Sequence, residues 1–292
     1  PRRAWLELIR APNLLTLPGN VLVGVALAGM GGGALRWIPA VLSGLALYAF
    51  GLIGNDLADR EEDARDRPRR PLPSGRISLR SARFAALLCA LTGLAAAGMA
   101  GWIPGAIAIT IAVLSVAYNA GGKKSPLFSI LSLGLCRGLL VLLGAAAADP
   151  GSLRNPQVLG GAGLITLYIA AVSLAARGEM KLHRTAPGVR VLPLLAAGLG
   201  IGLLAATGDG LSVRHILPAL LILSEPIRFL AITGGMRGVD PARIGRLLGH
   251  LCLIQAALLV WLPTRPIFWG LAGMLVAMTA LHAGLSRRFA AS

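Results

Sequence analysis

Acidic side chains gather in one short stretch of this chain, directly after an apolar segment. The stretch reads NDLADREED from Asn55 and holds five carboxylates, although the whole chain of 292 residues has only 12 Asp and Glu. If the apolar helix continues through Asp63, then Asn55, Asp59 and Glu62 or Asp63 lie on neighbouring turns, and Asp56 adjoins Asp59. Proteins bind Mg²⁺ through one or two such carboxylates together with substrate phosphate oxygens. The stretch therefore predicts a magnesium site.

A run of arginines follows the acidic stretch. Residues 67–78 read RPRRPLPSGRIS, and guanidinium groups bind phosphate through paired hydrogen bonds. Acids and arginines together favour recognition of a phosphorylated substrate. The alternative is a solvated loop in which Arg60, Arg65 and Arg67 only neutralise the acids, since exposed ion pairs contribute little to stability. Composition by itself leaves both interpretations open.

These charged residues must be positioned by a largely apolar chain. Hydrophobic residues make up 55% of it and charged residues 14%, and its mean hydropathy is +0.73, which is typical of a polytopic membrane protein. Apolar runs of about 17 to 25 residues cross a bilayer as helices. The expected spans are Asn13–Ala28, Trp37–Gly54, Ala82–Ala100, Ile103–Ala117, Leu127–Ala148, Val158–Ala176, Val191–Thr207, Ile216–Ile232, Ile244–Leu262 and Ile267–Leu285. We therefore predict an all-α transmembrane bundle of about nine to ten spans, in a single domain over residues 1–292.

Lys and Arg side chains gather on one side of the predicted bundle. If the spans alternate in direction, the basic segments 2–10, 60–83, 123–124, 177–190 and 237–246 face the same compartment, which the positive-inside rule makes the cytoplasm. The net charge of +16 then follows from topology and from attraction to anionic lipid. No basic surface is interleaved with aromatic residues, so we expect no nucleic-acid partner. We therefore predict an integral, multi-pass membrane protein with the acidic stretch on the cytoplasmic side. In a bacterium, the membrane would be the cell membrane.

The order of residues in the acidic and basic stretches resembles a family motif. NDxxDxxxD followed by RPxRPxPSGRIS, after the second span, resembles the first aspartate-rich motif and following loop of the UbiA superfamily of intramembrane prenyltransferases. The sequence RAPNL at residues 10–14, which enters the first span, is similar to that family as well. Tyr118 followed by Lys123 and Lys124 resembles its tyrosine-to-lysine signature. The resemblance covers the first half of the chain, in the context that such motifs require.

This resemblance implies a reaction and a set of site residues. The implied activity is transfer of an isoprenyl group from a prenyl diphosphate to a small-molecule acceptor, usually aromatic, in a cavity that opens toward membrane lipid. Mg²⁺ is the implied cofactor, and with basic side chains it would stabilise the charge that builds on the leaving pyrophosphate. The implied metal ligands are Asn55, Asp56, Asp59 and Asp63, and the three aspartates are also the catalytic candidates. The implied substrate contacts are Asn13, Asn55, Arg67, Arg70, Lys123 and Lys124.

The second aspartate-rich motif of that family has no full counterpart here. The corresponding stretch, residues 168–184, reads YIAAVSLAARGEMKLHR and keeps one acid, Glu179. Its basic neighbours would repel a second divalent cation but can neutralise a diphosphate directly, so we expect Arg177, Glu179 and Lys181 to contact substrate. This departure resembles the divergent EboC-like branch of the superfamily, found in gene clusters tied to the handling or export of secondary metabolites.

Three interpretations therefore stay open. One is a transferase that works with a basic half-site in place of the second metal site. Another is a non-catalytic protein that binds a prenyl diphosphate or another lipid, for instance as a component of secondary-metabolite transport. The third is a structural subunit that keeps only the helical bundle, which the residues of the first motif favour least.

Polar side chains inside the predicted spans are functional candidates, because ionisable groups in lipid are costly. Arg137 either faces the cavity, where it would contact diphosphate or acceptor, or pairs with another helix. Glu225 and Arg228 are expected to form an ion pair that stabilises the bundle. His250 and Gln255 have no metal-ligand spacing around them and are expected to hydrogen-bond between helices. The three cysteines lie scattered in apolar segments, so neither a disulfide framework nor a zinc site is expected.

Overall fold

A computed structural model shows how the helices are arranged. It describes residues 2–180, 187–207, 210–233, 241–262 and 266–289. Within these ranges the protein is helical, and nine helices are long and apolar enough to cross a membrane. A bent pair at the N-terminal end brings the number to ten if it is counted as one span. The structure thus confirms the predicted all-α membrane bundle of nine to ten spans.

The helices follow the apolar runs of the sequence. Their bounds are α1 Arg2–Leu8, α2 Ala11–Leu14, α3 Leu17–Leu27, α4 Ala34–Ala58, α5 Arg60–Asp66, α6 Leu79–Ala100, α7 Trp102–Asn119, α8 Pro126–Ala148, α9 Pro156–Met180, α10 Pro187–Thr207, α11 Ile216–Thr233, α12 Pro241–Trp261 and α13 Pro266–Phe289. Short 3₁₀ turns follow α7 (η1, Gly122–Lys124), α8 (η2, Pro150–Arg154) and α10 (η3, Val213–His215).

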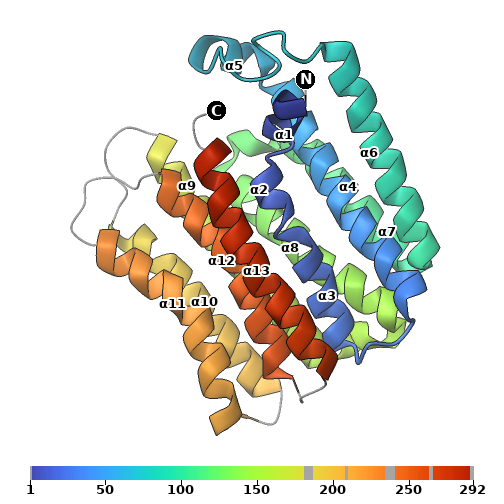
Figure 1. The fold of residues 1–292 in the computed structure, drawn as a ribbon, viewed down its shortest axis with the longest axis vertical. Coiled ribbons are helices and arrows are strands. Elements are labelled where there is room, and N and C mark those ends of the chain that lie inside the picture. Colours follow the sequence, from blue (N-terminus) through green and yellow to red (C-terminus); the bar gives the residue numbers. More distant parts are fainter. Residues whose placement is uncertain (1, 181–186, 208–209, 234–240, 263–265, 290–292) are drawn as a thin grey trace.

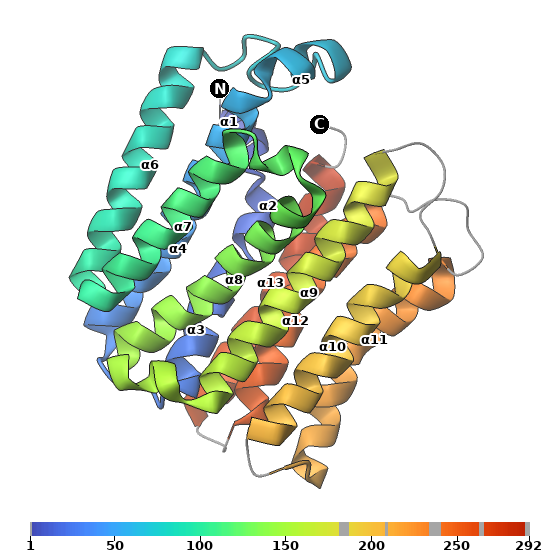
Figure 2. The same ribbon diagram turned by 180° about the vertical axis from the view of Figure 1, so that it is seen from behind.

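Figures 1 and 2 show these helices as one bundle, seen from opposite sides. Helix α8 packs against α3, α7 and α9. On one side α4 packs against α6 and α7, and on the other α10 lies between α9 and α11. Helix α12 contacts α11 and α13. Helices α1 and α5 lie at the same end of the bundle as the end of α13 (Figure 1).

The first span differs from the single continuous helix expected at Asn13–Ala28. Within that run the chain is divided between α2 and α3, and a bend of 61° separates these two from α1, which precedes the run. Arg10 adopts a left-handed backbone conformation at φ 46° before α2. Because a break frees backbone carbonyls that lipid cannot satisfy, other helices supply donors: the Thr16 carbonyl accepts a 2.8 Å hydrogen bond from Gln255 Nε2 and a 3.5 Å contact from Arg137 Nη1.

Two glycines bring α3 and α8 into backbone contact. A Cβ atom placed on Gly144 would overlap the carbonyl oxygen of Val21, and one on Gly24 would overlap that of Val141. Small residues allow such close packing in lipid, where dispersion contacts replace the hydrophobic effect as the force between helices. This contact fixes the position of α8 relative to α3 along the helix axis.

Candidate active site

A large cavity runs from the α5 end of the bundle toward its middle. Its volume is about 660 Å³, within the usual range for sites that hold small molecules. Apolar side chains of α4, α7 and α8, including Leu47, Ile111 and Leu140, form much of its wall. Helices α9 and α12 add Val172 and Leu248. The cavity can therefore hold an apolar tail, provided that polar groups at its ends hold a head group.

The acidic stretch supplies the polar end of this cavity, which we call the mouth. Asn55, Asp59 and Glu62 line it. The expected continuous helix is interrupted at Asp59, which lies between α4 and α5 with φ −89° and ψ 3°. Hydrogen bonds still connect the turns, because the Asp59 amide donates to the Asn55 carbonyl at 2.9 Å and the Asp63 amide donates to the Asp59 carbonyl at 2.8 Å. The spacing of Asn55, Asp59 and Glu62 therefore still brings them to one side.

Asp56 and Asp63 do not line the cavity and are held behind the mouth by Arg70. Arg70 Nη1 donates to Asp63 Oδ2 at 2.7 Å and lies 3.6 Å from Asp56 Oδ1. Arg10 Nη2 lies 3.7 Å from the same Asp56 oxygen. Both carboxylates are buried, with 7% of each side chain exposed. Arg70 therefore ties the loop after α5 to the end of α4.

Basic side chains face the acids across the mouth. Lys123, in the turn η1, forms an ion pair and hydrogen bond with Asp59 Oδ1. Burial lowers the pKa of Lys123 from the ordinary value, and Lys124 lowers it further, while the charge of Asp56 acts in the opposite direction. Arg67 and Lys124 also line the mouth and are exposed. The mouth thus combines acids that suit a divalent cation with cations that suit a phosphate.

The donor atoms at the mouth fit a magnesium ion shared with a ligand better than one held by protein alone. Among the residues that the structure describes, no three His, Cys, Asp or Glu side chains converge on a metal-binding geometry. Asn55, Asp59 and Glu62 nevertheless each offer a side-chain oxygen, the ligand type that Mg²⁺ selects. Asp56 is not part of this set, because its carboxylate lies behind the mouth beside Arg10 and Arg70. This set matches an ion that takes its remaining ligands from substrate phosphate and water.

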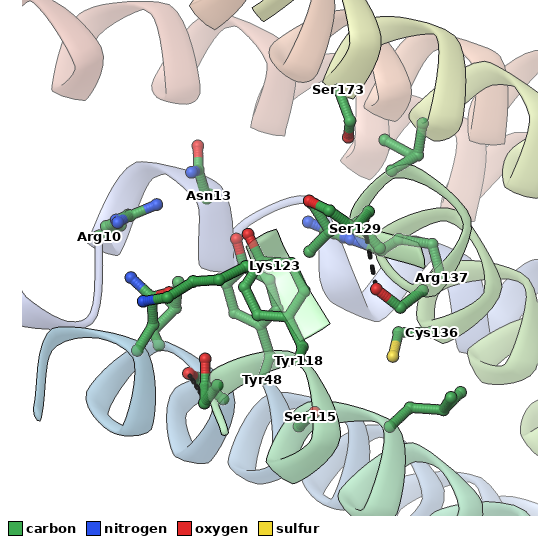
Figure 3. A pocket seen from close by; sticks show the side chains of 18 of the residues that line it. Arg10, Asn13, Tyr48, Ser115, Tyr118, Lys123, Ser129, Cys136, Arg137 and Ser173 are labelled. Carbon is green, nitrogen blue, oxygen red and sulfur yellow. Dashed lines mark hydrogen bonds between the residues drawn. The ribbon is translucent and has the colours of Figure 1, made fainter. Parts of the chain in front are cut away.

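The structure brings most of the remaining predicted substrate contacts together. Asn13 and Arg137 line the cavity along with Arg70 and the residues of the mouth. Figure 3 shows Asn13 at one side of the cavity and Arg137 at the other, with Tyr48 and Tyr118 between them. The side chains of Arg177 and Glu179, and Lys181 altogether, lie outside the described residues. Helix α9 reaches the cavity with Ser173.

Several cavity residues were not singled out from the sequence. Tyr48, Ser115, Ser129 and Ser132 line the cavity, as does Asn119, whose Oδ1 is buried without a partner. The sequence does carry a signal for them. Small polar residues recur on α7 and α8 at helical spacing, which marks the side of a transmembrane helix that faces other helices or a cavity.

Polar residues of the later spans serve helix packing. Glu225 lies 3.8 Å from Arg228 and 3.5 Å from Arg246 of α12, as the predicted ion pair requires. His250 shares hydrogen bonds with the hydroxyls of Tyr168 at 3.3 Å and Ser224 at 3.2 Å. The interhelical hydrogen bonding expected of His250 and Gln255 is confirmed.

Comparisons with known proteins agree with this arrangement. The model of the UbiA prenyltransferase family matches residues 18–266. A digeranylgeranylglyceryl phosphate synthase from Ignicoccus hospitalis is 30% identical over 259 residues, covering 82% of this chain and 84% of that protein. The enzyme of that name from Methanopyrus kandleri is 38% identical over 150 residues, and this match spans 50% of the chain and 54% of the relative.

A solved structure shares the fold at low sequence identity. It is a UbiA homolog from Archaeoglobus fulgidus bound to DMAPP and Mg²⁺, with a TM-score of 0.65, 16% identity, and coverage of 96% of this chain and 99% of the other. The match of the family model over most of the sequence, with the acidic and basic residues of its motif around one membrane cavity, assigns this chain to the UbiA prenyltransferase family.

Proposed function

We propose that this protein transfers an isoprenyl group from a prenyl diphosphate to the hydroxyl of a glyceryl phosphate lipid. The observation that carries the proposal is the mouth itself, where Asp59 and Glu62 face Arg67, Lys123 and Lys124 at the end of an apolar cavity. A prenyl diphosphate has the same division, with a charged head and an apolar tail. The head would lie at the mouth and the tail along the cavity wall.

The residues of the mouth divide the work on the diphosphate. Arg67, Lys123 and Lys124 would bind its phosphate oxygens, because guanidinium and ammonium groups form charge-assisted hydrogen bonds with phosphate. Asn55 and Asp59, with Glu62, would hold Mg²⁺. The ion would supply Lewis-acid stabilisation of the leaving pyrophosphate. Lys123 would then exchange its contact with Asp59 for one with the substrate.

In the transfer one bond forms and one bond breaks. The hydroxyl oxygen of the acceptor bonds to the first carbon of the prenyl chain, and the bond from that carbon to the diphosphate oxygen breaks. The electron pair leaves with the pyrophosphate, which also takes the hydroxyl proton. Fixed cations at the mouth lower the barrier because they stabilise charge that develops on the pyrophosphate during the step.

The proposed acceptor replaces the aromatic one that the sequence led us to expect. The relatives from Ignicoccus hospitalis and Methanopyrus kandleri are named for a product with two geranylgeranyl groups on a glyceryl phosphate. Removing one of those groups gives geranylgeranylglyceryl phosphate as the acceptor and geranylgeranyl diphosphate as the donor. An aromatic acceptor has no such support among these relatives.

The test is pyrophosphate release by purified protein in lipid nanodiscs. The donor is geranylgeranyl diphosphate, the acceptors are geranylgeranylglyceryl phosphate and 4-hydroxybenzoate, and each is assayed with Mg²⁺ or with EDTA. We expect release that needs both Mg²⁺ and the glyceryl phosphate. Asp59→Asn should lower the rate of release by about 10- to 100-fold. Glu61→Gln is the matched control, because Glu61 is a neighbouring acid whose side chain is 88% exposed.

Three other results would contradict the proposal in different ways. Release with 4-hydroxybenzoate alone would reject the glyceryl phosphate acceptor. Saturable, Mg²⁺-dependent binding of the donor without release under any condition would identify the binding protein that the altered second motif at 168–184 leaves open. Equal activity of Asp59→Asn and Glu61→Gln would remove the mouth from the reaction.

A further inference from the structure

A buried arginine lies deep in the cavity, away from the mouth. Arg137 is 7% exposed and lines the cavity within the transmembrane helix α8. It lies about 16 Å along α8 from the start of that helix at Pro126, at 1.5 Å rise per residue. The lysines of the mouth lie in the turn η1, which only Ser125 separates from Pro126. Arg137 is therefore set back from the groups that would bind the donor diphosphate.

The charge of Arg137 has no carboxylate partner in the described part of the chain. Its protein contacts are the Thr16 hydroxyl, which accepts from Nη1 at 2.9 Å, the Thr16 carbonyl, and the ring of Tyr48, whose centroid lies 4.8 Å from Cζ. An unpaired charge in the interior of a membrane protein is costly, and such groups mark sites that bind a ligand or an ion.

Most of the hydrogen-bonding capacity of Arg137 also remains unused. A guanidinium group has five N–H donors, and the hydrogen bonds of Arg137 to the described residues use only Nη1. Its Nε and Nη2 are not among the buried side-chain atoms that lack a partner, and Arg137 lines the cavity. Figure 3 shows the side chain extending into the cavity. The hydrogen bonds of Arg137 to Thr16, at the break in the first span, thus use only part of its hydrogen-bonding capacity.

We propose that Arg137 binds the phosphate of the acceptor, and so forms an anion subsite distinct from the mouth. This inference rests on the proposed function, since it takes the acceptor to be a glyceryl phosphate. The free hydroxyl of such an acceptor lies only a few bonds from its phosphate. A phosphate at Arg137 would hold that hydroxyl between Arg137 and the mouth, where the first prenyl carbon must lie. Tyr48 and Thr16 position the guanidinium for this contact.

The test compares two ligands that differ only in the phosphate. Geranylgeranylglyceryl phosphate and its dephosphorylated form, geranylgeranylglycerol, are bound to the protein in nanodiscs without donor, so that the readout does not need turnover. We expect the wild type to prefer the phosphate by about 10- to 100-fold, the range of one charge-assisted interaction. Arg137→Gln, which can still donate to Thr16, should bind the two ligands equally.

Two further variants make the result specific. Arg137→Lys keeps the charge but loses the planar fork, so it should keep part of the preference; it also serves if the Gln variant fails to fold. Arg67→Gln at the mouth should weaken binding of geranylgeranyl diphosphate and leave the preference between the two acceptor ligands unchanged.

The outcomes separate this inference from the proposed function. A wild type that binds both ligands equally, or neither, overturns the subsite, as does an Arg137→Gln protein that keeps the full preference. If the preference depends on Arg137 but no pyrophosphate is released in the transfer assay, the subsite stands and the transferase proposal fails. If transfer occurs and the preference follows Arg67 instead, the acceptor phosphate binds at the mouth.

Discussion

Lys123 and Asp59 form an ion pair across the mouth of the cavity, although 64 positions separate them in the sequence. The pair joins the turn before α8 to the break between α4 and α5. Asp59 belongs to the acidic stretch, and Lys123 belongs to the stretch that resembles the family's tyrosine-to-lysine signature. Since the side chains contact each other, their contributions to the reaction should not be independent.

A double-variant cycle tests this dependence. We expect Asp59→Asn and Lys123→Met each to lower kcat/KM for geranylgeranyl diphosphate by about 10- to 100-fold, the range of a lost charge-assisted hydrogen bond. The double variant should be less impaired than the product of the two single effects, because side chains in contact are not additive. Steady-state kinetics at saturating acceptor measures all four proteins. Strictly multiplicative effects would show that the two residues act separately.

Arg70 should matter for stability, because it lies between two buried carboxylates. Arg70→Ala leaves Asp56 and Asp63 without their shared cation, and breaking a buried ion pair in this way costs about 3 kcal/mol. We expect a clear fall in the thermal unfolding midpoint in detergent. Adding Asp63→Asn to that variant should restore part of the loss. Arg60→Ala is the control, since Arg60 pairs with the exposed Glu61 at 3.8 Å, and an equal fall there would reject the explanation.

The contact between α3 and α8 should not tolerate a side chain on the glycine. Gly144→Ala places a methyl group against the carbonyl of Val21, and relief of such overlap costs about 1–3 kcal/mol. Gly198→Ala in α10 is the matched control, because a Cβ there meets nothing within 4 Å and alanine favours helix. Unfolding of both variants in one detergent gives the comparison. Equal stabilities would mean that the helices can separate freely.

Glu225 should contribute to packing and not to chemistry. Its two arginine partners keep 61% and 44% of their side chains exposed, so solvent screens both pairs. We expect Glu225→Gln to lower the free energy of unfolding by about 1 kcal/mol or less. The kcat of transfer should be unchanged, because Glu225 does not line the cavity. A large fall in kcat with unchanged stability would place Glu225 in the reaction.

The spans and the motif could be predicted from sequence because both depend on local patterns. Apolar runs set the helices, and all ten predicted runs are helical within the described residues, the first of them broken into segments. The signal for that break was present, since Pro12 directly precedes the first run, Pro18 lies within it, and proline frees backbone groups in a helix. What could not be read was which distant side chains would satisfy those groups.

The direction of each acidic side chain was harder to predict. Asn55 and Asp59 reach the cavity as the helical spacing indicated. Asp56 and Asp63 turn toward Arg70, a residue that the family resemblance assigned to the substrate. Spacing fixes which residues share a helix face but not which cation lies opposite, because that depends on how the loop folds back.

The glycine contact between α3 and α8 has a consequence for substrate choice. Helix α8 carries Arg137, and the chain just before α3 carries Thr16, which anchors the guanidinium. The packing of Gly144 against Val21 thus sets how deep in the cavity Arg137 lies. On the proposal that Arg137 binds the acceptor phosphate, a change at this buried contact would alter head-group selection without touching any ligand.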